Sequence, residues 1–222
     1  MTVLRLMARE GKVIMKQRLA TLLSAGAFWV CPLYASEAMA PDALTKSVTD
    51  EVLAIVRSDK DIQAGNQKKV HELVESKVVP HFNFVRMTQL AMGRNWREAN
   101  AEQQKRLVEE FRTLLVRTYT AAFTQYKNQT VEYRRPRMAA GDTDVVVQSL
   151  IKQPNGQPVA VDYAMEKTDR GWKVYNVKIE GVSMVENYRN TFNTEVQRSG
   201  IDGLIKTLSD KNRQLVRPAQ ST

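Results

Sequence analysis

Residues 144–180, DVVVQSLIKQPNGQPVAVDYAMEKTDRGWKVYNVKIE, carry the clearest structural pattern in the chain. Apolar and polar residues alternate along this stretch in three runs, as in strands that bury one face. Pro154-Asn155-Gly156 and Thr168-Asp169-Arg170-Gly171 separate these runs and are typical of hairpin turns. A fourth alternating run precedes them. The sequence therefore predicts four antiparallel strands, at residues 130–134, 144–151, 158–166 and 172–180.

The residues before this sheet predict the longest helix of the chain. Asn100 is a favoured N-cap residue, and Gln103 stands where a capping box places its return hydrogen bond. From Leu107 to Tyr126, apolar side chains recur every three to four residues, and charged ones cover the opposite face. After Lys127 the period changes to two, so we expect the helix to end there.

Shorter amphipathic helices are expected on both sides of this segment. Pro80 and Gly93 end two of them, because proline interrupts a helix and glycine favours its C-terminal cap. The expected ranges are residues 42–57, 66–78, 83–92, 184–198 and 201–208, the last two separated by Ser199-Gly200. Helices, then strands, then helices define an α+β fold, in which a twisted four-stranded antiparallel sheet packs against the long helix and the surrounding helices.

Residues 1–40 have the three parts of a secretory signal peptide. A basic segment up to Arg18 is followed by an apolar run and then by small residues, which favours cleavage after Ala38. An uncleaved membrane anchor is the alternative, although the run is shorter than the roughly 20 apolar residues of a spanning helix. A lipoprotein anchored at Cys31 is a further alternative, but Phe28-Trp29-Val30 are bulky for a lipobox.

The chain that remains is moderately basic. It keeps 28 basic and 22 acidic residues, a net charge of +6, with the two signs mixed along the sequence. This pattern argues against nucleic-acid binding, which needs a clustered basic stripe, and fits attraction to anionic lipids or to an acidic partner. Residues 41–211 are long enough for a single domain with its own core, and we expect residues 212–222 to form a flexible tail.

Catalytic and metal-binding patterns are scarce. His71 and His81 lack a metal-ligand spacing, and the only cysteine lies in the signal peptide, so we predict no metal site and no disulfide. No glycine-rich phosphate loop or nucleophile elbow is present in the sequence. Asp162 and Glu166 share one strand face, which we interpret as a solvated outer face of the sheet; an acid–base pair in an apolar cavity is the alternative.

Several motifs, in their order and spacing, resemble the MlaC/toluene-tolerance family. The match covers roughly residues 45–210. The motifs are Val78-Val79-Pro80-His81-Phe82, Leu90-Ala91-Met92-Gly93-Arg94-Asn95-Trp96, the helix from Gln103 to Arg112, the Pro154-Asn155-Gly156 turn, Glu180-Gly181-Val182-Ser183-Met184 and Gly200-Ile201-Asp202-Gly203-Leu204.

The resemblance implies a fold similar to the NTF2-type cone, with an apolar cavity. It further implies a monomeric periplasmic carrier that is not an enzyme, needs no cofactor and holds a phospholipid as cargo. Such carriers move lipid between an outer-membrane Mla lipoprotein complex and an inner-membrane Mla ABC transporter complex, and thereby maintain the lipid asymmetry of the outer membrane.

The wall of such a cavity is expected to come from the apolar stripes. The candidate lipid-binding residues are Phe84, Met87, Leu90, Phe111, Leu115, Tyr119, Phe123, Val145, Val147, Val161, Tyr163, Tyr175, Val177, Ile179, Val182 and Met184. Contacts at the rim or to the headgroup are expected from Lys127, Arg134 or Arg135. Two alternatives stay open: a small enzyme on an NTF2-like cone with Asp162 in its cavity, and an interaction protein or chaperone whose apolar stripes form only a core.

Overall fold

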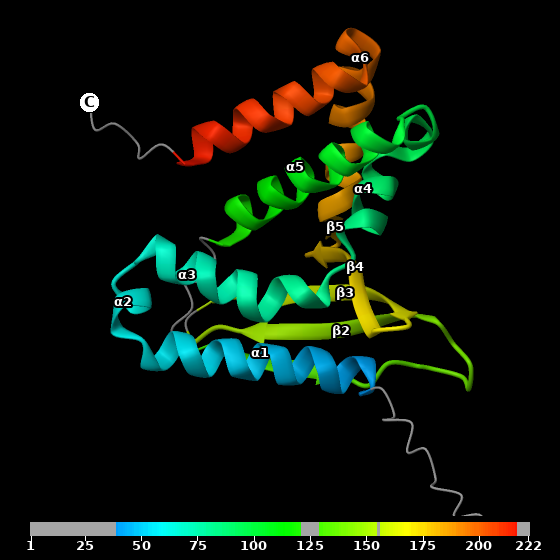
Figure 1. Cartoon of the computed structure of the whole chain (residues 1–222). Helices are drawn as coiled ribbons and strands as arrows, with labels where there is room; N and C mark the ends of the chain where they lie inside the picture. Colours follow the sequence, from blue (N-terminus) through cyan, green and yellow to red (C-terminus); the bar gives the residue numbers. More distant parts are fainter. Residues whose placement is uncertain (1–38, 121–128, 155, 217–222) are drawn as a thin grey trace, which may run out of the picture. The chain divides into compact units, whose positions relative to one another are not determined.

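The computed structural model describes residues 39–120, 129–154 and 156–216, and residues 37–222 form one compact unit (Figure 1). The expected signal peptide therefore lies almost wholly outside the described residues. Among the residues that are described, no helix is long and apolar enough to cross a membrane. The helical elements are α1 (Pro41–Ser58), α2 (Lys60–Gln63), α3 (Gln67–Leu73), η1 (Val74–Val78), η2 (Val79–His81), α4 (Phe84–Met92), η3 (Gly93–Arg97), α5 (Ala101–Thr120) and α6 (Met184–Val216).

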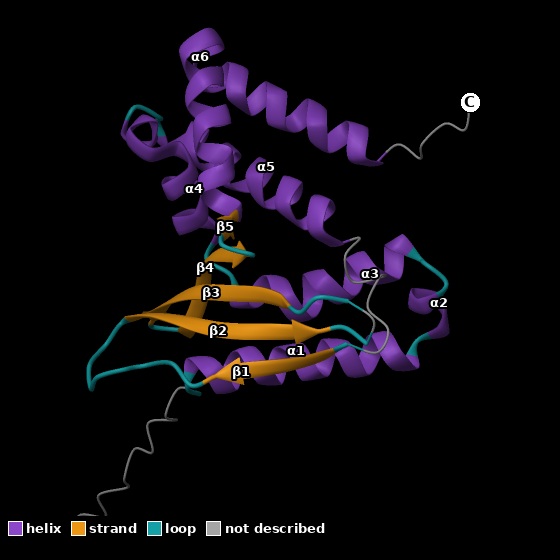
Figure 2. Cartoon of the chain, turned by 180° about the vertical axis from the view of Figure 1, so that it is seen from behind, coloured by secondary structure: helices purple, strands orange, loops and turns teal. Residues whose placement is uncertain are grey.

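The sheet confirms the predicted antiparallel arrangement but has five strands in the described part of the chain, in the order β1-β2-β3-β4-β5 (Figure 2). The strands are β1 (Thr130–Arg134), β2 (Asp144–Lys152), β3 (Val159–Thr168), β4 (Gly171–Ile179) and β5 (Val182–Ser183). The fifth strand was missed because it has only two residues. Glu180 and Gly181, both with positive φ, turn the chain so that Val182 pairs with Ile179.

A β-bulge in β4 interrupts the alternation that the sequence predicts. Ala164 pairs with Asn176, but the next residue, Met165, pairs with Val174 and passes over Tyr175. The extra residue reverses which side chains face each side of the sheet. Trp172 and Val174 precede the bulge along β4 and Val177 follows it, and all three are buried. Tyr175, at the bulge itself, is only partly buried.

The predicted capping box opens α5. The backbone N–H of Gln103 donates to Asn100 Oδ1 at 2.9 Å, and the N–H of Asn100 donates to Gln103 Oε1 at 3.1 Å. These reciprocal bonds satisfy two amide groups that a helix start leaves without partners. The predicted extension of this helix to Tyr126 lies outside the described residues.

The helix before Pro80 ends differently from the prediction. Regular α-helix stops at Leu73, and the chain continues as the π-helical turn η1 and the 3₁₀ turn η2, which contains Pro80. Proline has no N–H to donate, and its ring crowds the carbonyl four residues earlier, here that of Ser76. The turns before it therefore widen instead of keeping the α-helical hydrogen-bond pattern.

The C-terminal helix is broken where the sequence predicts, at Gly200, whose φ is 71° and ψ is −177°. Beyond this break the helix continues to Val216 and not only to Leu208, so residues 212–216 of the expected tail are helical. Asn212 is only 3% exposed, and its side-chain amide donates to the Glu110 carbonyl oxygen at 2.9 Å and to Glu110 Oε2 at 2.7 Å.

Two apolar clusters form the centre of the unit. One joins α4, α5 and α6 and includes Phe111 and Phe192. The other lies on the sheet and includes Val147 and Trp172. Phe82 and Met184 pack against both clusters, and Met184 begins α6 directly after β5.

Candidate functional site

A cavity of about 350 Å³ lies between the sheet and the helices. Its volume falls in the range of about 300–1,000 Å³ that is usual for ligand pockets. Side chains from α1, η1, η2, α4, α5, the start of α6 and the strands β1 to β4 form its wall, which is almost wholly aliphatic or aromatic. The polar side chains among the described lining residues are Thr45, Thr49, His81, Tyr119 and Tyr163.

Strand register places one row of apolar side chains along the floor of the cavity. Val161 pairs with Ile179 and Tyr163 pairs with Val177, and directly opposite residues in an antiparallel pair share a face. All four side chains line the cavity. The bulge keeps this face apolar further along the sheet, because it sets Val174 opposite Met165, and both also line the cavity.

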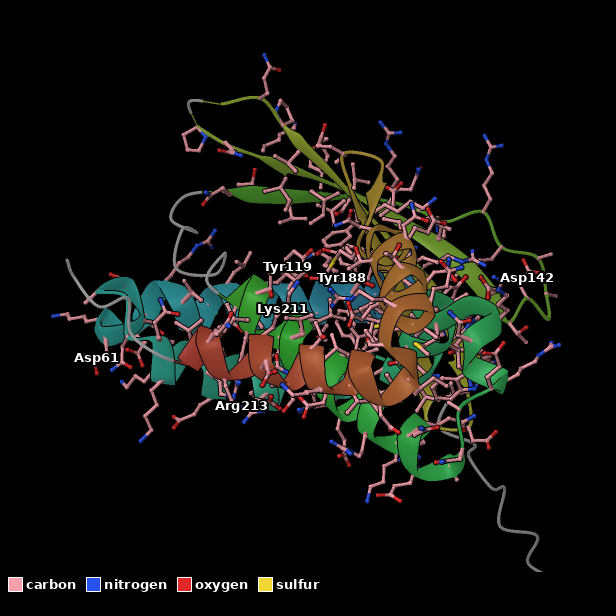
Figure 3. The ribbon with its side chains drawn as sticks, turned by 90° about the horizontal axis from the view of Figure 1, so that it is seen from above. Asp61, Tyr119, Asp142, Tyr188, Lys211 and Arg213 are labelled. Atoms are coloured by element: carbon pink, nitrogen blue, oxygen red, sulfur yellow. The ribbon has the colours of Figure 1, made fainter. Side chains whose placement is uncertain are left out.

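Helices close the cavity from the other sides. From α1, one face with helical spacing points inward and contributes Val48 and Val52. Met87 of α4 is 1% exposed, and Leu115 of α5 is also buried. Near the end of the described part of α5, Tyr119 lies beside Tyr188 of α6 (Figure 3).

The polar groups of the wall are uncharged near neutral pH or are satisfied by hydrogen bonds. Burial raises the pKa of the Tyr163 and Tyr119 hydroxyls, so both stay protonated. Burial and the nearby Lys173 ammonium lower the pKa of His81, which favours the neutral imidazole. Thr45 donates its hydroxyl to the carbonyl of Pro41 at 2.7 Å. A wall without fixed charge suits an apolar ligand and disfavours an ionic one.

Comparison with known proteins identifies the family of this fold and cavity. The model of the MlaC protein family matches residues 46–210, about three quarters of the chain. The chain belongs to the MlaC family. Its predicted relationship to that family is thereby confirmed.

Individual relatives agree with this membership. The intermembrane phospholipid transport system binding protein MlaC of Haemophilus influenzae is 22% identical over 78% of this chain and 83% of its own. The toluene tolerance protein ttg2D of Pseudomonas putida is 26% identical over 88% of each chain. A solved structure of a phospholipid-binding protein from Ralstonia solanacearum, in complex with a phospholipid, is 45% identical and superimposes with a TM-score of 0.73. The match covers 79% of this chain and 98% of that one.

In this MlaC-family chain, the structure brings nine of the sixteen candidate residues together around the cavity. They are Phe84, Met87, Leu115, Tyr119, Val161, Tyr163, Val177, Ile179 and Met184. Their contact with a lipid stays a prediction. Phe123 lies outside the described residues, as does Lys127, so neither can be placed.

Three candidates belong to the core and do not line the cavity. Phe111 is fully buried between Tyr188 and Phe192, with ring centroids 5.1 and 5.0 Å away. Val145 and Val147 share the inner face of the sheet with Met165 and Tyr163, but they pack within the sheet cluster. An apolar stripe shows that a side chain is buried and does not show whether its neighbour is protein or empty space.

Three further candidates point away from the cavity. Val182 is 63% exposed on the edge strand β5, and Leu90 lies on the exposed side of α4. The bulge turns Tyr175 toward Asp144, to which its hydroxyl donates at 2.7 Å. Arg86 lies over the Tyr175 ring, 3.6 Å from its centroid. Burial and the hydrogen bond to Asp144 raise the pKa of Tyr175 to about 12.

Other expected site residues also lie elsewhere. Asp162 alternates with the cavity-lining Val161 and Tyr163 and is not among the lining residues, which agrees with an outer face. The prediction that this face is solvated is wrong for Glu166, whose side chain is only 18% exposed because Arg86 of α4 binds it. Arg134 and Arg135 line a separate groove on the sheet. No group of three or more potential metal ligands is present in the described part of the chain.

Sequence reasoning missed the contribution of the first helix. Its apolar residues recur every three to four positions, which predicted a helix with one buried face. Leu44, Val48, Val52 and Leu53 lie on that face and line the cavity. The periodicity was visible, but only the packing of α1 along the sheet shows what that face covers.

Proposed function

We propose that this chain is a periplasmic phospholipid carrier, which moves lipid between an outer-membrane lipoprotein complex and an inner-membrane ABC transporter complex. The apolar cavity between the sheet and the helices carries the proposal, because its uncharged wall suits acyl chains. The Haemophilus influenzae relative, whose name assigns it to an intermembrane phospholipid transport system, supports the pathway. The Ralstonia solanacearum structure, which holds a phospholipid, supports the ligand.

The energetics of acyl-chain burial suit a carrier. A chain of about 15 methylenes gains roughly 12 kcal/mol when it leaves water, at about 0.8 kcal/mol per methylene. A bilayer buries the same chain equally well, so the net free energy of transfer from membrane to cavity is small. The carrier can therefore hold its cargo in aqueous surroundings and release it at a membrane complex without an energy source of its own.

The remaining features of the proposal follow from the same function. We propose that residues 1–40 direct export and are removed, that the mature protein is a monomer, and that the sheet and its helices form an NTF2-like cone around the cargo. The phospholipid is cargo and not a cofactor, and no residue is assigned a catalytic role.

A bulky side chain placed in the cavity tests the proposal. Thr49 is half-buried on α1 and lines the cavity, so Thr49→Trp fills part of the space without removing an existing core contact. Ser47→Trp is the matched control, because Ser47 is exposed on the same helix and is not among the lining residues. Native mass spectrometry of protein purified without detergent would count the phospholipids bound per chain.

We expect stoichiometric phospholipid in the unmodified protein and in Ser47→Trp, and a clear loss in Thr49→Trp. Val48→Trp, at a neighbouring half-buried lining position, provides a second test if Thr49→Trp folds poorly. Thermal melting separates lost binding from lost folding. An unmodified protein that carries no lipid and takes up none from vesicles would refute the carrier function.

A further inference from the structure

A second groove, of about 510 Å³, lies at the end of β1 and shares no lining residue with the apolar cavity. We call it the arginine groove; its lining residues are Arg134, Arg135, Pro136, Arg137, Val146 and Gln148. Three arginines within four consecutive residues line one hollow, and no acidic residue lines it.

Two carboxylates near the groove are engaged by other groups, and a third, Asp162, lies opposite Gln148 on the same face without lining the groove. Glu132 pairs with Lys152 at 2.5 Å. Asp144 accepts hydrogen bonds from Arg86 and from the Tyr175 hydroxyl. In the described part of the chain, no ion pair therefore neutralises the arginine groove, and its three positive charges are available to an external anion.

Strand register places the arginine groove on the outer face of the sheet. Arg134 pairs with Gln148, so both side chains point to the same face. Val131, three residues before Arg134 on the same strand, lines the cavity on the opposite face. Asp142, in the loop that follows the groove, lies well away from Tyr119 at the cavity (Figure 3). The groove and the apolar cavity therefore lie on opposite faces of the sheet.

Exposed apolar side chains accompany the arginines. Val146 lines the groove and is 47% exposed, and Met138, which follows Arg137, is 39% exposed. Basic side chains next to exposed apolar ones are typical of surfaces that lie on a membrane, where the charges meet headgroups and the apolar groups enter the interface. A guanidinium is also well matched to phosphate, because its planar fork can donate two parallel hydrogen bonds.

We propose that the arginine groove, together with Met138, is a docking surface that binds the anionic phospholipid headgroups of a bilayer. The phosphodiester oxygens accept hydrogen bonds from Arg134, Arg135 and Arg137, and Val146 and Met138 contact the headgroup region. An acidic protein surface would be attracted by the same charges, and the vesicle experiment below distinguishes it from a bilayer. The inference goes beyond the carrier function, because it concerns how the protein approaches a membrane and not what fills its cavity.

Vesicle binding of residues 37–222, the compact unit, tests the docking surface and avoids the apolar leader sequence. Co-sedimentation is measured with vesicles of phosphatidylglycerol and phosphatidylcholine in equal parts and with vesicles of phosphatidylcholine alone. The test variant carries Arg134→Gln, Arg135→Gln and Arg137→Gln. The matched control, Arg94→Gln, Arg97→Gln and Arg106→Gln, removes the same charge from exposed positions in η3 and α5.

We expect the unmodified protein and the control to bind the anionic vesicles and the test variant to bind them roughly 100-fold more weakly, since each arginine near an anionic surface contributes a factor of about five. Binding should weaken as salt is raised and should be slight on phosphatidylcholine alone. Val146→Ser should also weaken binding to anionic vesicles, by a smaller factor, with the net charge unchanged.

Equal losses in the test and control variants would overturn the proposal, because they would show an effect of net charge alone. Unchanged vesicle binding in the test variant, with impaired lipid transfer to the membrane complexes, would also overturn it and indicate an acidic protein partner. Displacement by inorganic phosphate, at an ionic strength where chloride has no effect, would show a small-anion site instead. Bound phospholipid counted by native mass spectrometry in each variant separates failure of docking from failure of the carrier function.

Discussion

Arg86 is expected to fasten α4 to the sheet, and its replacement by methionine tests this directly. The guanidinium donates to Glu166 Oε2 at 2.5 Å and to Asp144 Oδ2 at 2.9 Å, and it stacks on Tyr175. Asn83, the N-cap of α4, donates to the second oxygen of Glu166 at 2.7 Å. One arginine thus connects α4 to β2, β3 and β4.

The magnitude follows from the exposure of each partner. The Glu166 side chain is 18% exposed, so this hydrogen-bonded pair contributes about 1.5–2 kcal/mol. The Asp144 side chain is 47% exposed, and solvent reduces that pair to less than about 1 kcal/mol. Stacking on Tyr175 adds about 0.5–1 kcal/mol. Arg86→Met keeps the apolar stem and should therefore lower the free energy of unfolding by about 2–3 kcal/mol.

Urea unfolding measures this loss, and a thermal melt should show a decrease in Tm of about 4–10 °C. Arg86→Lys keeps the positive charge but loses the planar guanidinium, which donates to both carboxylates, so we expect an intermediate decrease in the free energy of unfolding. Arg106→Met is the matched control, since Arg106 is exposed on α5, and should change stability by less than about 0.5 kcal/mol. Because α4 carries Phe84 and Met87 into the cavity wall, Arg86→Met should also release bound lipid faster if the proposed function holds.

A double-mutant cycle with Glu166→Gln isolates the interaction. The loss in the double variant should be smaller than the sum of the single losses by at least about 0.5 kcal/mol. Losses that add fully, or an Arg86→Met variant as stable as the Arg106→Met control, would contradict the assignment of Arg86 as the connection between α4 and the sheet.

Three further predictions concern stability. Asn212→Ala should cost about 1–3 kcal/mol in urea unfolding, because it removes both buried hydrogen bonds to Glu110; no loss would mean that the last turns of α6 are not held in place. Gly200→Ala should cost about 1–2 kcal/mol, although nothing lies within 4 Å of the added carbon, because a φ of 71° strains an L-residue; an unchanged urea midpoint would show that the break relaxes. Burial and Lys173 lower the pKa of His81 in the folded protein. In the unfolded chain this histidine has a pKa of about 6.5, so the unfolded chain binds more protons than the folded protein once the pH falls to that value. Stability should therefore fall as the pH falls from about 7 to 5, and His81→Gln should reduce this slope; equal slopes would show that His81 is solvated.

Local signals in the sequence predicted most of the secondary structure. The hairpin turn at residues 168–171, the capping box at Asn100 and the helix break at Gly200 depend on residues close together in the chain, and the structure shows all three. The sequence motifs predicted membership in the MlaC family, which the comparison confirms. Where local rules failed, the cause was a short feature without a period of its own, such as the two-residue strand β5 or the bulge at Tyr175.

Sequence patterns were enough to predict that the chain is α+β, where its four longer strands run and which face of each element is apolar. It could not determine which apolar residues line the cavity, because core and cavity wall have the same hydrophobic pattern. Phe111 and Leu115 lie one helical turn apart on α5, yet Phe111 packs among aromatic rings and Leu115 faces the cavity. This difference depends on tertiary packing, since a cavity arises where elements distant in sequence fail to fill the space between them.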